Sequence, residues 1–301
     1  MQNRIPFAGK IRNHPVGALG GAIALALIVP ALSFSSPLEK VELGSTARYA
    51  VLAGSLISNI PGSAITGDLG LSPSAGSMIT GFGANEITGT VFTVDQTGPA
   101  GSVAAASDLT TAKGDLTIAY NDAAGRTPVP SGPFLNPGAG DIGGLTLVPG
   151  LYKFTSSLAV TGSDLTLSGN ADDVWIFQIA SDLNVGNGIK VVLAGGARSA
   201  NIFWQVGTSA TLGTTSVFQG TIMADQSISM NTGATLVGRA LASTAAVTLA
   251  SSTVTRPVSS SSSLKGHAGQ KRSFRRMGFY GVHGASDLNG RTARSQTPFI
   301  D

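Results

Sequence analysis

The chain has 301 residues and no cysteine, which excludes a disulfide framework and any thiolate chemistry. Hydrophobic residues make up 42% of the chain, ample for a large core, whereas charged residues make up only 12%. The net charge of +3 conceals a division, because residues 37–255 carry 8 basic and 14 acidic side chains while both ends are basic. A mildly acidic body is poorly suited to neutralising phosphates, so we expect no nucleic-acid partner.

The first 33 residues have the pattern of an export signal. Lys10 and Arg12 precede an apolar run from about Val16 to Leu32, and Ala31-Leu-Ser33 places small residues at the cleavage spacing. We therefore expect residues 1–33 to be a cleaved signal peptide. The mature protein is then secreted or held at the cell surface, and has no membrane span. An uncleaved anchor is the alternative, since about 17 apolar positions approach the length of a span.

Residues 37–257 predict a mainly β domain. Tyr49–Gly54 and Ile65–Leu71 have the composition of two short strands. The segment 74–98 is rich in Gly and Thr and lacks periodicity, which predicts an irregular cap loop. In the strands around Trp175 and Trp204, apolar residues occupy both alternating sets. This pattern predicts strands that are covered on both sides, with the core inside and a helix outside.

A near-constant repeat marks the second half of the domain. Short polar segments begin at Val160, Asn184, Thr208, Thr232 and Ser252, at steps of 24, 24, 24 and 20 residues. Such a period is typical of a solenoid, in which each turn stacks on the last. Stacked turns present equivalent residues as rows on a flat face, so we expect a surface rich in Thr, Ser and Ala instead of a cleft.

The period changes between about 100 and 124, where one amphipathic helix is predicted. Its apolar stripe recurs at spacings of three and four, through Ala106, Leu109, Ala112, Leu116, Ala119, Tyr120 and Ala123. Gly114 costs such a helix about 1 kcal/mol relative to Ala, so packing must hold it. We expect the helix to lie along one flank of the solenoid.

The pattern stops at Arg256-Pro257. A serine run, Ser259–Ser263, leads into a segment with Lys271, Arg272 and further Arg residues. This composition predicts a disordered basic tail over 258–301. Its charge could hold an anionic cell-surface polymer or lipid; a solvated tail with no specific role is the alternative.

Few residues of the body could support catalysis. The three histidines are His14, His267 and His283, so residues 37–255 contain neither His nor Cys. A Ser-His-Asp triad, a thiol nucleophile and a zinc site are thereby excluded there. The adjacent acids Asp172 and Asp173 lie in a turn composition, and hydrogen bonding in a turn explains them better than a glycosidase pair. We expect no catalytic residue, no cofactor and no metal.

Several ordered segments together resemble the ice-binding-protein-like family of bacteria, fungi and microalgae. The resemblance spans about residues 48–255 and rests on Ala50-Val-Leu-Ala-Gly-Ser55, Ala64-Ile-Thr-Gly-Asp-Leu-Gly-Leu-Ser-Pro73, Gly150-Leu-Tyr152, Asp173-Val-Trp-Ile-Phe-Gln178, Asn201-Ile-Phe-Trp-Gln-Val206, Phe218-Gln-Gly-Thr-Ile222 and Gly233-Ala-Thr-Leu-Val-Gly-Arg-Ala-Leu241. It implies a right-handed, irregular β-solenoid of triangular section, with one long α-helix alongside and an early cap loop. It also implies export, no cofactor, and adsorption to ice through one flat face.

The resemblance further implies strands with the pattern Thr-(Ala/Gly)-x-(Thr/Asn) on that face. Thr232-Gly-Ala-Thr235 matches fully, and Thr208-Ser-Ala-Thr211 departs at its second position. We predict an ice-contacting set of Thr208, Thr211, Thr232 and Thr235, with weaker members Thr161, Asn184, Thr248 and Thr253.

Strand geometry leaves the register of this face open. Residues i and i+3 of a straight strand point to opposite faces. In the alternative register Ser229, Asn231 and Thr211 point outward, while their neighbours Ile228, Met230, Ala210 and Leu212 point inward. A second function also stays open: a secreted adhesive solenoid that binds polysaccharide through exposed aromatic residues and never contacts ice. In either case we expect a monomer.

Overall fold

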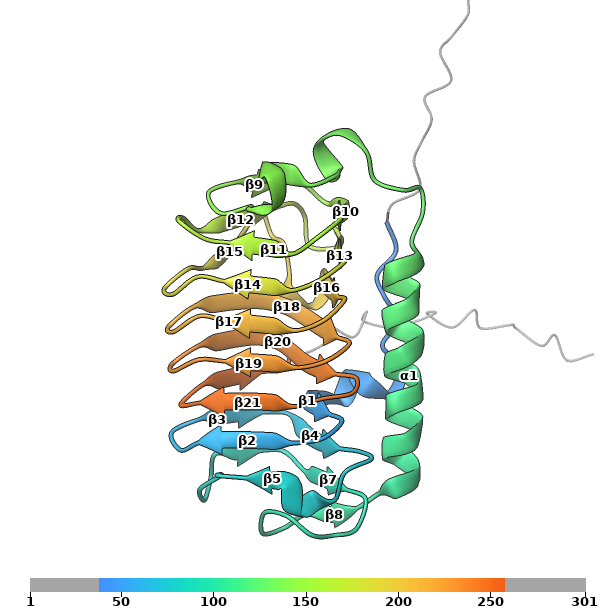
Figure 1. The fold of residues 1–301 in the computed structure, drawn as a ribbon, viewed down its shortest axis with the longest axis vertical. Coiled ribbons are helices and arrows are strands. Elements are labelled where there is room, and N and C mark those ends of the chain that lie inside the picture. The colour runs from blue at the N-terminus through green and yellow to red at the C-terminus, as the bar shows by residue number, and fades with distance from the viewer. Residues whose placement is uncertain (1–37, 258–301) are drawn as a thin grey trace, which may run out of the picture. The chain divides into compact units, whose positions relative to one another are not determined.

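A computed structural model describes residues 38–257 as a three-sided stack of short strands with one long helix alongside (Figure 1). The predicted signal peptide (1–33) and basic tail (258–301) lie outside the described residues. The strand pairs in the three sheets are parallel, as in a solenoid whose coils stack directly on one another. The predicted mainly β solenoid with a flanking helix is confirmed.

One side of the stack is a seven-stranded sheet. In spatial order it consists of β11 (Leu158–Val160), β14 (Leu183–Val185), β17 (Ala210–Leu212), β19 (Ile228–Met230), β21 (Val247–Ala250), β2 (Ile57–Ile60) and β5 (Ile79–Thr80). Along each strand, buried residues alternate with outward ones, because successive side chains point to opposite faces. The inward residues are almost all Val, Ile, Leu or Met, which is why these segments form strands over a core.

A twelve-stranded sheet bends around a corner to form the other two sides. The side next to the helix contains β10 (Gly150–Phe154), β13 (Trp175–Ile179), β16 (Ile202–Val206), β1 (Tyr49–Ala53), β4 (Asp68–Leu71), β7 (Val91–Thr93) and β8 (Val103–Ala104). Two long strands, β18 (Val217–Ala224) and β20 (Thr235–Ala242), pass from this helix side to the third side. They bend at Gly220 and Gly238, where a Cβ on Gly238 would stand 1.8 Å from the Gly220 carbonyl oxygen.

The third side is completed by two groups of short strands. Next to the start of β20 lie β22 (Thr253–Thr255), β3 (Ala64–Thr66) and β6 (Ile87–Thr88). At the other end a three-stranded sheet contains β15 (Val191–Ala194), β12 (Leu165–Ser168) and β9 (Thr146–Leu147). There are five short 3-10 turns among residues 38–257. In chain order, η1 (Gly44–Arg48) precedes β1, η2 (Gly76–Met78) lies between β4 and β5, η3 (Gly132–Phe134) and η4 (Pro137–Gly140) precede β9, and η5 (Ser199–Asn201) precedes β16.

The coils do not follow one another in sequence order. β1 pairs with β20, β2 with β21 and β3 with β22, so the first coil stacks directly on the last. The chain then descends to β8, and α1 (Ala106–Gly125) and the segment after it return the chain along the stack to the opposite end, where β9 begins (Figure 1). The joint between the two halves is therefore made of strands that lie far apart in the sequence.

A ladder of aromatic rings fills the core. Tyr152, Phe177, Trp204 and Phe218 follow one another, with ring centroids 5.2, 3.9 and 4.8 Å apart. Trp175 and Trp204 are both fully buried, as their double-apolar strands predict. Each aromatic ring removes a large apolar area from water, so this ladder contributes strongly to the stability of the stack.

Helix α1 covers the outer side of the helix-side strands. There Leu52, Ile176, Phe203, Met223 and Leu241 form a second apolar cluster, packed against the helix residues Leu109, Ala112, Leu116, Ala119 and Ala123. The predicted arrangement of core inside and helix outside is thus confirmed. The helix begins at Ala106 instead of about residue 100, and Ala106 is exposed although it belongs to the predicted stripe.

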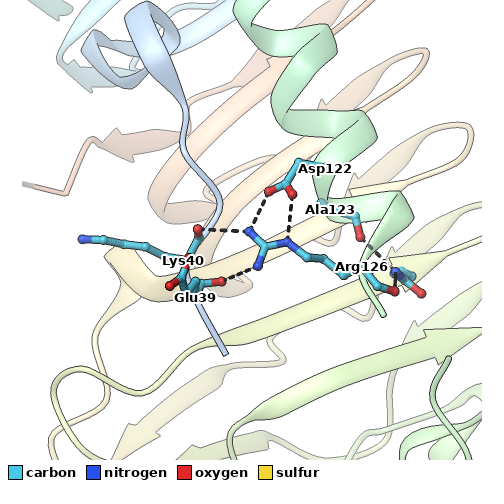
Figure 2. A network of polar contacts seen from close by, with 6 residues as sticks. Glu39, Lys40, Asp122, Ala123 and Arg126 are labelled. Atoms are coloured by element: carbon cyan, nitrogen blue, oxygen red, sulfur yellow. Dashed lines mark hydrogen bonds and ion pairs between the residues drawn. The ribbon is translucent and has the colours of Figure 1, made fainter. Parts of the chain in front are cut away.

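Polar contacts fix the C-terminal end of the helix. The guanidinium of Arg126 pairs with Asp122 at 2.7 Å and donates to the backbone oxygens of Glu39 and Lys40, which ties the first described residues to the helix end (Figure 2). The side-chain amide of Gln178 donates to carbonyls of the last helical turn, which would otherwise lack partners.

Lys113 contributes a buried contact between the helix and the sheet. Its Nζ donates to the carbonyl oxygens of Ala242, at 2.9 Å, and of Ser243. Burial lowers the pKa of Lys113 to about 8, because a desolvated ammonium loses its hydration. The charge is tolerated since both carbonyls face it.

Two sequence expectations on local structure are wrong. The predicted strand Ile65–Leu71 is two strands, β3 and β4, because the chain turns a corner at Gly67 with φ +130°. The segment 74–98, expected to be an irregular loop, supplies β5, β6 and β7 at one end of the stack. Two-residue strands carry too little alternation to be seen in a sequence.

Candidate functional site

The outward residues of the seven-stranded side form one straight line, which we name the central row. Consecutive members are paired across neighbouring strands: Ala159, Asn184, Thr211, Ser229, Thr248, Ser58 and Thr80. The residues on either side of each member point inward and are buried, except that Thr80 ends its strand and is followed by the exposed Gly81. The alternation of each strand therefore forces the row to face solvent.

The hydroxyl groups of the central row are free. Within residues 38–257, none of Ser58, Thr80, Thr211, Ser229 and Thr248 forms a side-chain hydrogen bond to the protein. The row also contains no charged residue. Every hydroxyl is thus available to bind water. No charged side chain in the row carries a hydration shell of its own that would compete with this water.

The geometry of the row suits an extended ordered surface. Neighbouring strands of a sheet lie about 4.8 Å apart, so seven paired positions extend over about 29 Å. Thr combines a methyl group with a hydroxyl, and its β-branched side chain loses little rotamer freedom in a strand. Such a line holds waters by many weak contacts made at once, and needs no single strong site.

The border of the central row differs between its two ends. Near β2 and β5 it is apolar, since Ile60 is 63% exposed and Met78 43% exposed. Near β14 it is polar, where Asp182 accepts hydrogen bonds from Thr208 and Ser209 on the next coil. The hydrogen bond from Thr208, chiefly, lowers the pKa of Asp182. This carboxylate therefore serves to clamp two turns together.

The four threonines predicted to form one ice-contacting set lie on different parts of the stack. Thr211 lies in the central row, whereas Thr235 begins β20 on the third side. Thr208 precedes β17 and Thr232 follows β19, so both lie in turns. The four residues do not share one face. The alternative register is right for β17 and β19, in which Ala210, Leu212, Ile228 and Met230 are buried.

The weaker set is divided in the same way. Asn184 and Thr248 belong to the central row, and Thr253 lies on the third side beside Thr235. Thr161 follows β11, and its hydroxyl donates to Asp141 instead of facing water alone. Thr208 is similarly occupied by Asp182. The hydroxyls of Thr161 and Thr208 therefore hold a neighbouring coil, which the sequence pattern cannot reveal.

The error has a simple source in coil length. The strands of the seven-stranded side begin at Leu158, Leu183, Ala210, Ile228 and Val247, so the steps are 25, 27, 18 and 19 residues. The even step of 24 is therefore wrong, and segments chosen by it drift from strand to turn. The sequence pattern does not identify Ser58 and Thr80, because their coils precede the helix in the sequence and join the row only through the pairing of β2 with β21 and of β5 with β2.

Several other polar side chains of the body have structural partners. Asp173 accepts a hydrogen bond from the Asn170 amide at 2.6 Å, as a turn residue does, and Asp172 is exposed. A hollow beside α1 is lined in part by Gln178 and Gln205, whose amides donate to the helix end and to the Tyr120 hydroxyl. Among residues 38–257, no cluster of three or more His, Cys, Asp or Glu could hold a metal ion.

Comparison with known proteins decides the family. Residues 51–255 match the sequence profile of a family described as Ice-binding-like. The chain belongs to this ice-binding-like family. An ice-binding protein of Flavobacterium frigoris (strain PS1) is 50% identical over 220 residues, which cover 73% of this chain and 78% of that protein. One from a Colwellia species is 44% identical, over 72% of this chain and 84% of the relative.

Solved structures of the ice-binding-like family agree. An ice-binding protein from an Arctic yeast, whose structure was determined to explain its antifreeze activity, superposes with a TM-score of 0.67. The two are 41% identical, over 73% of this chain and 95% of the yeast chain. A family member from an Antarctic biological consortium gives a TM-score of 0.61 at 42% identity, over 73% of this chain and 93% of its own.

The described part of this family member contains no helix that is long and apolar enough to cross a membrane. Both tryptophans of the body are fully buried, and neither offers a surface on which a sugar ring could stack. The adhesive alternative requires such exposed platforms, so the structure gives it no support in residues 38–257.

Proposed function

We propose that this chain binds ice through the central row of the seven-stranded side, and that it thereby inhibits crystal growth or recrystallisation. The observation that carries the proposal is the row itself: seven outward residues in one register, uncharged, with five free hydroxyls. The relatives that bear the name ice-binding protein support the choice of ice as the ligand. The activity is adsorption, with no catalytic residue, cofactor or metal.

The physical basis is a preorganised plane. The parallel backbone hydrogen bonds fix the row, so ordering the surface on binding costs little conformational entropy. Waters that are hydrogen-bonded to the hydroxyls can take positions of an ice lattice. The methyl groups between them exclude water that is not part of this layer. A side chain that projects above the row would hold the lattice away and weaken every neighbouring contact.

The test compares two tyrosine variants of the full chain. Thr248→Tyr lies in the middle of the row, and Asn121→Tyr lies on the exposed side of α1 as a matched control. Growth of a single ice crystal in purified protein gives the gap between melting and freezing points. We expect faceted crystals, a gap reduced by at least half in Thr248→Tyr, and no change in Asn121→Tyr. Circular dichroism should show both variants folded, since both positions face solvent.

Each other outcome has a definite meaning. A gap that Thr248→Tyr leaves intact would keep ice binding and remove it from this row. Round, freely growing crystals at high protein concentration would reject ice as the ligand and favour the adhesive alternative.

The sequence supports further proposals about the whole chain. We propose that residues 1–33 direct export and are removed, that residues 37–257 act outside the cell as a monomer, and that 258–301 form a basic tail able to contact anionic cell-surface polymer. Mass spectrometry of the exported protein tests the first point. A mature form that begins near Phe34–Pro37 is the expected result, and an intact N-terminus would indicate an anchor.

A further inference from the structure

A second set of threonines faces outward on the third side, on strands that continue from the central row. Thr235 of β20 pairs with Thr253 of β22, and Thr255 of β22 pairs with Thr66 of β3. Thr66 in turn pairs with Thr88 of β6. We name these five residues the third-side array. They occupy four adjacent strands, about 4.8 Å apart, and Thr253 and Thr255 lie about 6.7 Å apart along one strand.

The array shares the properties of the central row. The neighbours Leu236, Val254 and Ile65 are buried, so the threonines face solvent. None of the five hydroxyls hydrogen-bonds to another described residue. This distinguishes them from the turn threonines Thr161 and Thr208, whose hydroxyls are taken by aspartates. Free hydroxyls in register are therefore found on two sides of the stack, on strands that share the same coils.

The array has a clear end. Further along the third side, the equivalent outward positions are Val217, Gln219 and Val192, and Lys190 pairs with Val217. A charged side chain and a long amide replace the threonines there. Both carry hydration that an ordered water layer would have to displace. The uncharged array is thus confined to the coils around β22, β3 and β6.

The corner between the two surfaces is held rigidly. The carboxylate of Glu86 accepts hydrogen bonds from the Asn59 side chain, at 3.0 Å, and from the backbone of Gly62, Ser63 and Gly83. The Ser252 amide donates to the Ser63 hydroxyl at 2.8 Å. These contacts join the corners of three successive coils, β21–β22, β2–β3 and β5–β6, at a fixed angle.

Glu86 remains ionised in this position. Desolvation by itself raises its pKa, but the hydrogen bonds from Gly83, Gly62, Ser63 and Asn59 together lower it below the ordinary value. The corner therefore keeps its charge-assisted hydrogen bonds at neutral pH. Two planes with free hydroxyls therefore meet at an edge that these hydrogen bonds hold together.

We propose that the third-side array is a second ice-contacting surface, so that the chain engages ice with two planes that meet at this corner. The inference rests on the proposed function, since ice is the ligand of both surfaces. A protein with two such planes binds more than one orientation of the crystal surface. The central row alone would select fewer orientations.

The test maps which ice planes are bound. A fluorescent-protein fusion of the full chain is adsorbed to a hemisphere grown from a single ice crystal, and the labelled planes are recorded. The variants are Thr66→Tyr and Thr88→Tyr on the array, Thr248→Tyr on the central row, and Asn121→Tyr as control. Thr66 and Thr88 are exposed, and two positions are used so that a folding defect in one does not decide the result.

We expect the two array variants to remove one set of labelled planes, and Thr248→Tyr to remove another. Array variants that keep the wild-type pattern and freezing gap, while Thr248→Tyr abolishes both, would overturn the second surface and keep the proposed function. Loss of all labelling in the array variants alone would also overturn the two-surface form and move the site to the third side. A wild-type fusion that labels no plane would reject the proposed function and this inference together.

Discussion

The helix side and the seven-stranded side are built from the same coils, yet one is covered by α1 and the other faces solvent. Consecutive strands show the difference: in β16 the outward residue Phe203 is 1% exposed beneath the helix, and in β17 the outward residue Thr211 meets water. The inward residues of both strands are equally apolar and buried. The difference therefore lies in the outward residues: apolar outward residues bind the helix, and polar outward residues leave the side open to solvent.

The first prediction tests the difference between the two sides by substituting Phe203 and Thr211. Phe203→Ala should lower the free energy of unfolding by about 3–5 kcal/mol, because it leaves a cavity beneath α1. Thr211→Ala should change it by no more than about 0.5 kcal/mol, since the side chain lies on the outer surface of the sheet and its hydroxyl bonds to no described residue. Urea unfolding followed by circular dichroism measures both. Equal effects would contradict the assignment of the two sides.

The second prediction concerns the buried charge beneath the helix. Unfolded Lys113 keeps its proton up to its ordinary pKa of 10.5, whereas folded Lys113 loses it near pH 8. Between these values the unfolded state binds more protons, so stability must rise with pH. Relative to Lys113→Met, the wild type should gain up to about 3 kcal/mol between pH 7 and pH 11.

Thr248→Met serves as the matched substitution on the open side for this pH series. Its stability difference from the wild type should be the same at every pH, because Thr248 has no proton to lose in this range. Parallel curves for Lys113→Met and the wild type would show that Lys113 is not desolvated by the helix.

The third prediction, with the smallest expected change in stability, concerns a glycine inside the helix. A Cβ on Gly114 would meet no atom within 4 Å, and the residue lies inside α1. Gly114→Ala should therefore stabilise the protein, by about 0.5–1 kcal/mol, through the lower entropy of the unfolded chain. Gly220→Ala should do the reverse, since φ is +108° there and a Cβ would stand 2.7 Å from the Ile202 carbonyl oxygen. Thermal unfolding distinguishes the two signs.

The candidate site was only partly predictable. Thr211, Asn184 and Thr248 were predicted and lie in the central row, whereas Thr235 and Thr253 lie on another side, and Thr161, Thr208 and Thr232 lie in turns. A pattern of four letters cannot separate an outward strand residue from a turn residue. Their free or occupied hydroxyls depend on what the neighbouring coil places opposite them.

The sequence by itself determined which residues of the longer strands and of the helix are buried. Alternation of period two set which residues of each strand point inward, and the stripe from Leu109 to Ala123 set the buried face of the helix. These patterns depend on side chains a few residues apart, so a single chain contains them in full.

Only the tertiary structure decided how the coils stack. The pairing of β1 with β20, β2 with β21 and β3 with β22 brings Ser58, Thr80, Thr66 and Thr88 into line with residues from the far end of the chain. Backbone hydrogen bonds between parallel strands carry little information about which strand pairs with which, and turns of unequal length hide the register. The flat surfaces proposed to bind ice are therefore properties of the assembled stack.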